Sequence, residues 1–131
     1  MQFKLRTYHM LRILLYLTAH PDARCNGPAI AAFYGISHSP LRKAIHELAK
    51  AGFILSFQGK NGGIVLAKPP ENISLLDIVA LSDPDLIFPT EPPIEAVTQS
   101  DHALESALNA TNQTFQHALN SITIADVIAC V

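Results

Sequence analysis

The side chains that could do chemistry in this chain are mainly cations, and they are confined to its first half. All nine Lys and Arg residues lie between Lys4 and Lys68, together with only two of the eleven Asp and Glu residues. Residues 1–68 therefore carry a formal charge of +7 and residues 69–131 a charge of −9, which leaves −2 for the whole chain. A cationic half favours a polyanion such as double-stranded DNA, because each neutralised phosphate releases condensed counterions.

Catalysis has no comparable pattern. The sequence contains no Gly-rich phosphate loop, no nucleophile elbow and no convincing pair of carboxylates, so we do not expect an enzyme. The two cysteines, Cys25 and Cys130, lie far apart without CxxC spacing, and two free thiols in a reducing cytoplasm are the simplest interpretation. Cys25 follows Arg24 and precedes a predicted helix start, and both features favour a thiolate, so Cys25 is the redox candidate. An ordinary loop thiol is the alternative.

The six histidines raise a metal or haem hypothesis. His9, His102 and His117 could meet in a dimer, but no pair of histidines forms a compact ligand motif, and we predict no metal site. The acidic residues that could add oxygen ligands for a hard cation are Glu91, Glu95, Asp101 and Glu105. We favour a solvated acidic face that keeps the second half of the chain off DNA.

The composition allows a buried core and predicts that some apolar side chains remain on the surface. The chain has 131 residues, 49% hydrophobic and 15% charged, with a mean hydropathy of +0.24. This length fits one domain with an extension, and the scarcity of surface charge points to a partner that covers apolar surface. The most apolar stretch, residues 11–19, is far shorter than the ~20 residues that span a bilayer. Neither a membrane span nor a secretory signal is expected.

Apolar periodicity predicts three helices in the basic half. The first covers residues 5–19. The second begins near Gly27-Pro28 and stops at Gly35, and the third begins at Ser37 or Ser39 and ends at Gly52. The buried stripe of the third helix is Leu41, Ala44, Ile45, Leu48 and Ala51. Its opposite face carries Arg42, Lys43, His46, Glu47 and Lys50.

Two extended runs follow, residues 53–57 and 63–67, joined by a Gly- and Asn-containing segment typical of a tight hairpin. Helix, short turn, helix and hairpin is the order of a winged helix–turn–helix, so we expect a mainly α fold with a small β-hairpin wing. The residues predicted to probe the major groove are Ser37, His38, Ser39, Arg42 and Lys43. The wing would contribute Gln58, Lys60 and Asn61. Possible clamps on the DNA backbone are Lys4, Arg6 and Arg12. For each basic residue taken singly, a solvated charge is the alternative.

The acidic half begins with a helix through Leu81, which Ser74 and Asp77 start as a capping box. Residues 82–93 hold four prolines and predict an irregular loop. A long helix follows from Ile94 or Ser100 to Leu119, and a short last helix begins at residues 123–126. We therefore divide the chain into a winged helix–turn–helix domain (1–81), a proline-rich loop (82–99) and a long helix with a short C-terminal helix (100–131).

Several of these stretches resemble the Rrf2 family of bacterial transcription regulators. They are MQFKLRTYHMLRILLYL at 1–17, ISHSPLRKAIHELAKAG at 36–52, KNGGIVLAKP at 60–69, ISLLDIV at 73–79 and ITIADV at 122–127. The start and the KNGG wing look most like the nitric-oxide-responsive repressor branch. The resemblance implies a homodimer on a palindromic operator, with the long helix crossing its partner. The expected dimer contacts are Leu104, Leu108, Phe115 and Leu119.

The chain departs from this family at positions that matter. Iron–sulfur members carry three cysteines in the loop after the helix that ends here near Leu81, whereas this loop has none and places His102 near the third position. Tyr8 replaces an aspartate that serves the nitric-oxide branch as a further ligand. Without thiolates a cluster has no anchor, so we predict no iron–sulfur cluster and no other cofactor. Arg42 and Pro40 stand where many relatives have an acidic and an aromatic residue, so the family's usual operator is not assumed for this chain.

The expected function is therefore a cluster-free, homodimeric regulator of transcription, acting as a repressor. Two alternatives stay open. The fold could be inherited by a protein-interaction module whose basic face meets an acidic protein, or the regulator could sense through a different ligand or through the redox chemistry of Cys25.

Overall fold

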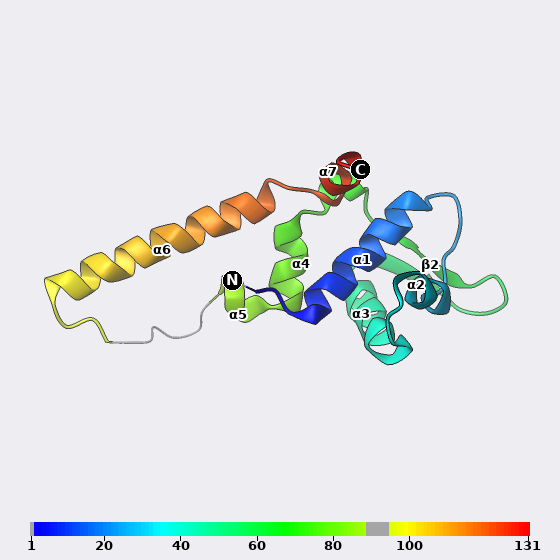
Figure 1. The fold of residues 1–131 in the computed structure, drawn as a ribbon, viewed down its shortest axis with the longest axis horizontal. Helices are drawn as coiled ribbons and strands as arrows, with labels where there is room; N and C mark the ends of the chain where they lie inside the picture. The colour runs from blue at the N-terminus through cyan, green and yellow to red at the C-terminus, as the bar shows by residue number, and fades with distance from the viewer. Residues whose placement is uncertain (1, 89–94) are drawn as a thin grey trace.

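The structure is a computed structural model that describes residues 2–88 and 95–131 (Figure 1). Its helices are α1 (Leu5–Ala19), α2 (Gly27–Tyr34), α3 (His38–Lys50), α4 (Leu75–Ser82), α5 (Pro84–Ile87), α6 (Gln99–Asn120) and α7 (Ile124–Ala129), with a short 3-10 helix at Pro70–Asn72. The strands are β1 (Ile54–Phe57) and β2 (Gly63–Leu66). Figure 1 shows a body built from α1 to α4, α7 and the hairpin, from which α6 extends as an arm. The predicted mainly α fold with a β-hairpin wing is confirmed.

Helix α1 is the centre of the body. Its residues Met10, Ile13, Leu14 and Leu17 are almost completely buried, and the helix packs against α3 and β2 as well as α4 and α7. The predicted span of residues 5–19 is confirmed. The helix also buries His9, whose Nδ1 atom has no hydrogen-bond partner among the described residues. Burial, reinforced by the nearby charge of Arg12, lowers the pKa of His9, which favours the neutral imidazole.

Helices α2 and α3 form the predicted helix–turn–helix. The side chain of Asn26 accepts a hydrogen bond of 2.8 Å from the Ala29 N–H and caps α2, which ends at Gly35 in the left-handed conformation. Ser37 occupies the cap position of α3, but its side chain makes no capping hydrogen bond. Leu41, from the predicted buried stripe of α3, is completely buried.

The wing is an antiparallel hairpin in which Ile54 pairs with Leu66 and Phe57 with Gly63. The segment before α2 adds a third, one-residue strand to it. The Cys25 N–H donates to the Ile64 carbonyl at 3.1 Å, and the Ile64 N–H donates to the Cys25 carbonyl at 2.7 Å. These two bonds fix residues 20–26, hereafter the strap, against β2.

The C-terminal segment returns to the body. The Leu75 N–H donates to the Ile122 carbonyl at 2.8 Å, and the Ile124 N–H donates to the Ile73 carbonyl at 2.9 Å. Capping boxes start three helices, with Ser74 before α4, Thr98 before α6 and Thr123 before α7. Although our sequence division groups α7 with the arm, α7 packs on α1 in the structure.

The expectation of an irregular loop over residues 82–93 is wrong in one part. Pro84 begins the short helix α5, because proline is tolerated in a first helical turn. The predicted loop positions Pro89, Pro92 and Pro93, and the acidic candidate Glu91, lie outside the described residues. The long helix begins at Gln99, one residue before the predicted start at Ser100, and ends at Asn120, one residue after the predicted end at Leu119.

The arm joins the body through a second buried cluster formed by Val79, Ile87 and Leu119. The Asn112 and Gln116 side chains, one turn apart on α6, both donate hydrogen bonds of 3.2 Å to the Ile87 carbonyl. The first residues of the chain reach the same junction, where Phe3 stacks on Phe115. None of the helices in the two described segments combines the length and apolar character needed to cross a membrane.

The close approach of the strap to the wing generates a stability prediction. Gly63 has φ +139°, and a Cβ atom there would lie 2.8 Å from the Cys25 carbonyl oxygen, whereas Gly59, with φ +92°, has open space around it. Gly59→Ala should lower the free energy of unfolding by about 1 kcal/mol, because only the left-handed backbone is disfavoured. Gly63→Ala should lower it by about 3 kcal/mol, because the strap must also move. Urea unfolding followed by circular dichroism measures both, and equal losses would contradict the packing of strap on wing.

Candidate nucleic-acid interface

Helix α3 and the wing share one groove. Its volume is about 600 Å³, and it lies between the exposed face of α3 and β1. The lining residues are Ser39, Arg42, Lys43, Ile45, His46, Ala49, Ser56 and Gln58. Four of the side chains predicted to meet DNA therefore line one surface, three from the helix and one from the wing. All four are exposed.

A second hollow of about 360 Å³ lies on the strap side of the same ridge. Residues 25–28, at the end of the strap and the start of α2, line it together with His38 from the first turn of α3. Arg42 and Gln58 line both hollows, so these two side chains lie where the hollows adjoin. A guanidinium and an amide are the groups that read guanine and adenine edges by paired hydrogen bonds.

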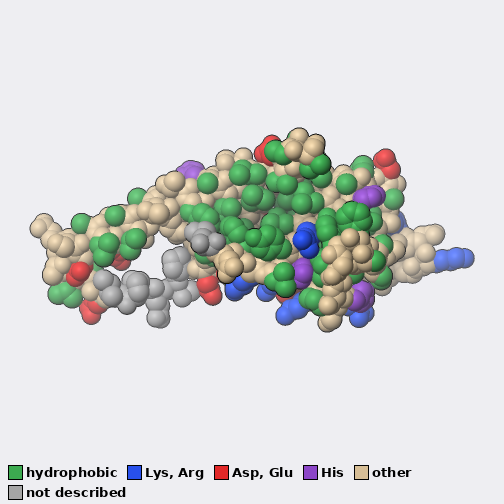
Figure 2. Space-filling model, in the orientation of Figure 1, with side chains coloured by type: hydrophobic (Ala, Val, Ile, Leu, Met, Phe, Trp, Pro, Cys, Tyr) green, Lys and Arg blue, Asp and Glu red, His purple; other side chains and the backbone are tan. Residues whose placement is uncertain are grey.

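Lys60 and Asn61 lie in the loop between β1 and β2 and are exposed. Figure 2 shows Lys and Arg side chains over the body, along its lower edge and at its hairpin end, whereas the arm shows acidic side chains. The cations therefore lie on the body, whereas the acidic side chains are divided between the arm and the body, where Asp83 pairs with Lys4 and Asp126 belongs to α7.

The structure gives two of the predicted backbone clamps other partners. Lys4 Nζ lies 3.3 Å from Asp83 Oδ1, and Arg6 Nη2 lies 2.6 Å from Glu47 Oε2. The Lys4 and Arg6 side chains remain 57% and 42% exposed, whereas the side chains of their partners Asp83 and Glu47 are only 9% and 22% exposed. The charges of Lys4 and Arg6 are therefore partly compensated before any DNA arrives. The third clamp, Arg12, places its guanidinium 5.1 Å from the centre of the Tyr34 ring.

The surroundings of Cys25 differ from those that we expected to favour a thiolate. The side chain is buried under the wing, and burial raises the pKa of its thiol. We expected Arg24 and the start of α2 to favour a thiolate, but the Arg24 guanidinium is directed to the wing loop. A buried thiol with a raised pKa is a weaker nucleophile than a free thiolate, so this environment does not supply the thiolate that we expected, and the redox role stays a prediction. Cys130, in contrast, is exposed.

The predicted dimer stripe of α6 divides into two parts. Leu104 and Leu108, on the outer part of the arm, are 50% and 58% exposed. Leu119 is buried in the chain's own second cluster, and Phe115 packs against that cluster. The inner two residues therefore already have partners within the chain, and the outer two are uncovered.

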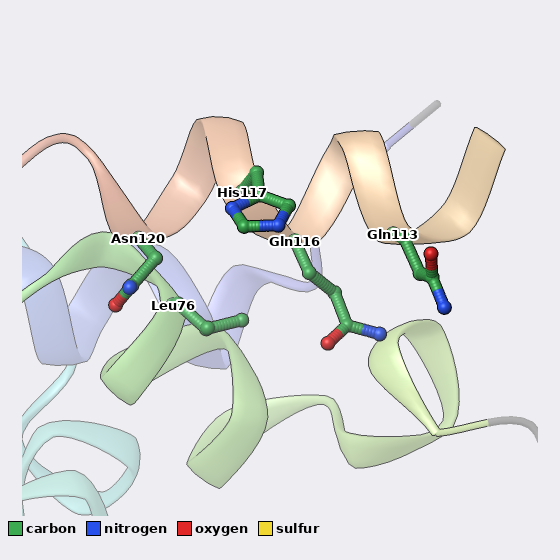
Figure 3. Close-up of a pocket in the computed structure, with 5 residues that line it drawn as sticks. All are labelled: Leu76, Gln113, Gln116, His117 and Asn120. Carbon is green, nitrogen blue, oxygen red and sulfur yellow. The ribbon is translucent and has the colours of Figure 1, made fainter. Parts of the chain in front are cut away.

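A small pocket of about 170 Å³ lies where the arm leaves the body. Figure 3 shows Gln113, Gln116, His117 and Asn120 on successive turns of α6, with Leu76 of α4 beside them. His117 is its one titratable group. Across residues 2–88 and 95–131, no group of three or more His, Cys, Asp or Glu side chains is arranged to hold a metal ion.

A helix–turn–helix followed by a two-stranded wing, with cations on both, defines a winged helix–turn–helix protein. The chain belongs to the Rrf2 family, described as "Iron-dependent Transcriptional regulator", which matches residues 3–130. It is therefore a DNA-binding regulator of transcription and not an enzyme.

Solved structures share this fold. CymR (YrzC), the global cysteine regulator of B. subtilis, has a TM-score of 0.82 at 21% identity, and the match covers 100% of this chain and 98% of that one. IscR from T. potens has a TM-score of 0.77 at 23% identity, covering 98% of this chain and 87% of the other. The oxidised form of CymR from Staphylococcus aureus has a TM-score of 0.75 at 22% identity, with coverages of 98% and 96%.

The family description implies iron, but the residues present do not fit an iron–sulfur cluster. The whole sequence contains two cysteines. Cys25 is buried between the strap and the wing, and Cys130 is exposed at the end of α7. Iron–sulfur clusters are held mainly by Cys thiolates, and two cysteines, one of them buried against the wing, do not supply the usual set of ligands.

Proposed function

We propose that this chain is a homodimeric repressor that binds a palindromic operator and works without an iron–sulfur cluster. The observation that carries the proposal is the groove that unites Ser39, Arg42 and Lys43 of α3 with Gln58 of the wing. The first turns of a recognition helix reach base edges in the major groove. A wing with small residues and a cation at its tip suits the adjacent phosphates.

The homodimer is supported by the outer part of α6. Leu104 and Leu108 are one turn apart, and more than half of the Leu108 side chain is exposed. Helix α6 has 22 residues, and the part that contacts the body is its C-terminal half. A second copy that crosses the arm would remove these leucines from water.

The repressor role is supported by the resemblance to the nitric-oxide-responsive repressor branch. A cytoplasmic protein is proposed because its partner is DNA. Helix α6 carries Asp101 and Glu105 and no Lys or Arg, and this negative charge would keep the arm from competing for the same phosphates.

A mobility-shift titration at several salt concentrations tests DNA binding. Lys60→Ala should weaken binding to all duplexes and lower the salt slope by about one, because a single phosphate contact is lost. Arg42→Ala should instead change the preference between sequences, by about tenfold or more at the affected position. Lys50→Ala, which removes a cation outside the groove, is the matched control.

If Lys60→Ala leaves the salt slope of binding unchanged, the wing does not contact the DNA phosphates through Lys60. A protein that binds no duplex at low salt but binds an acidic protein would be the interaction module instead.

The homodimer predicts a second result. Leu108→Glu should convert the protein to a monomer in analytical ultracentrifugation and weaken operator binding at least about a hundredfold, because one subunit reaches only a half-site. Ser106→Glu adds the same charge on the opposite face of α6 and should leave the dimer intact. Equal behaviour of the two variants would remove α6 from the interface.

The absence of a cluster predicts a third. Protein purified without oxygen should have no visible absorption band and less than one iron per subunit. The variant Cys25→Ala/Cys130→Ser should bind the operator as tightly as the parent protein. A coloured, iron-containing protein that loses DNA binding with a chelator would contradict the cluster-free proposal.

A further inference from the structure

Three cations of the basic half lie outside every set of predicted DNA contacts, and one of them, Arg24, is held against the wing. Arg24 lies in the strap, and its Nη1 donates a hydrogen bond of 2.6 Å to the Asn61 carbonyl in the wing loop. The same guanidinium lies 3.8 Å from the centre of the Phe57 ring, at the end of β1. One planar group therefore contacts both the strand that enters the loop and the loop itself.

The backbone of the strap gives this side chain a fixed base. The next residue, Cys25, exchanges two backbone hydrogen bonds with Ile64 of β2. A Cβ added to Gly63 would lie 2.9 Å from the Arg24 Cβ, so the strap and β2 are in close contact. The strap therefore holds the backbone of Arg24 beside β2, and the Arg24 side chain reaches across to β1 and the loop.

The wing needs such support. Ile54 and Ile64 anchor its two strands in the core, but residues 58–62 extend beyond the last paired position, Phe57 with Gly63, and are not held by the sheet. The loop contributes one internal hydrogen bond, of 3.0 Å, from the Gly62 N–H to the Gly59 carbonyl. Lys60 lies between these two glycines, so the conformation of the loop sets the position of its side chain.

We propose that Arg24 is a positioning residue that holds the wing tip where Lys60 and Asn61 meet DNA. The inference rests on the proposed function, because it assigns a cause to the geometry of the proposed wing contact. A planar guanidinium can stack on a ring and donate in its own plane at the same time, and the ammonium of lysine cannot reproduce this pair of contacts.

Hydrogen exchange tests the positioning role without DNA. In Arg24→Ala and Arg24→Lys, the hydrogen-bonded amides at the wing tip, that of Gly62 and those of the adjoining β1–β2 pairing, should exchange about tenfold faster or more, because the loop opens more often. Amides in the buried face of α1 should keep their protection, which shows that the body stays folded. Unchanged exchange in the wing would overturn the proposal.

Operator binding separates positioning from direct phosphate contact. Arg24→Ala should weaken binding about tenfold, and Arg24→Lys should do the same, although it keeps the charge. A direct phosphate contact predicts that lysine restores binding. Phe57→Leu, which removes the ring and leaves the charge, should reproduce part of the loss.

A double-mutant cycle with Lys60 completes the test. If Arg24 acts through the wing, Lys60→Ala should cost several-fold less affinity in the Arg24→Ala background than in the parent, and the double variant should lose about one unit of salt slope. Additive losses, with about two units of slope, would make Arg24 a second phosphate contact and overturn the proposal. If the parent protein binds no duplex, the proposed function fails, while the exchange experiment still decides the role of Arg24.

Discussion

The burial of α1 holds the two halves of this protein in one body. Met10, Ile13, Leu14 and Leu17 are 0–2% exposed, and the helix contacts α3 and β2 as well as α4 and α7. The elements that would read DNA and the elements that carry the arm therefore share one core. Removing large buried side chains from such a core costs about 2–5 kcal/mol each, so neither half can shift far while α1 stays packed.

Local sequence signals predicted the elements well. Ser74 with Asp77, and Thr123 with Asp126, satisfy helix ends within four residues, and the structure forms both capping boxes. Proline was the ambiguous signal. It usually interrupts helices, yet it also suits a first turn, and at Pro84 it begins α5.

Pairings between distant residues could not be predicted from these signals. Cys25 is buried against the wing, where its backbone pairs with Ile64, and nothing near Cys25 in the sequence indicates that pairing. The same holds for Arg6 with Glu47 and for Arg24 with Asn61. In the sequence, Cys25, Arg6 and Arg24 all look like ordinary solvated residues. In the structure each has a different environment, which its neighbours in the sequence do not indicate. The DNA-contact residues themselves remain a prediction, to which the shared groove of α3 and the wing adds support.

The attachment of the arm to the body has a consequence for the spacing of binding sites. The side-chain amides of Asn112 and Gln116, both on α6, donate hydrogen bonds to the same Ile87 carbonyl, and Leu119 on the same helix is buried. A helix anchored at adjacent turns cannot swivel freely, so in a homodimer joined through the arms the distance between the two recognition helices is a fixed dimension of the protein. The arms would then act as a ruler. One inserted base pair between half-sites turns the second half-site by about 35°. Rigid arms could not turn the second recognition helix by the same angle, so it would no longer face its half-site.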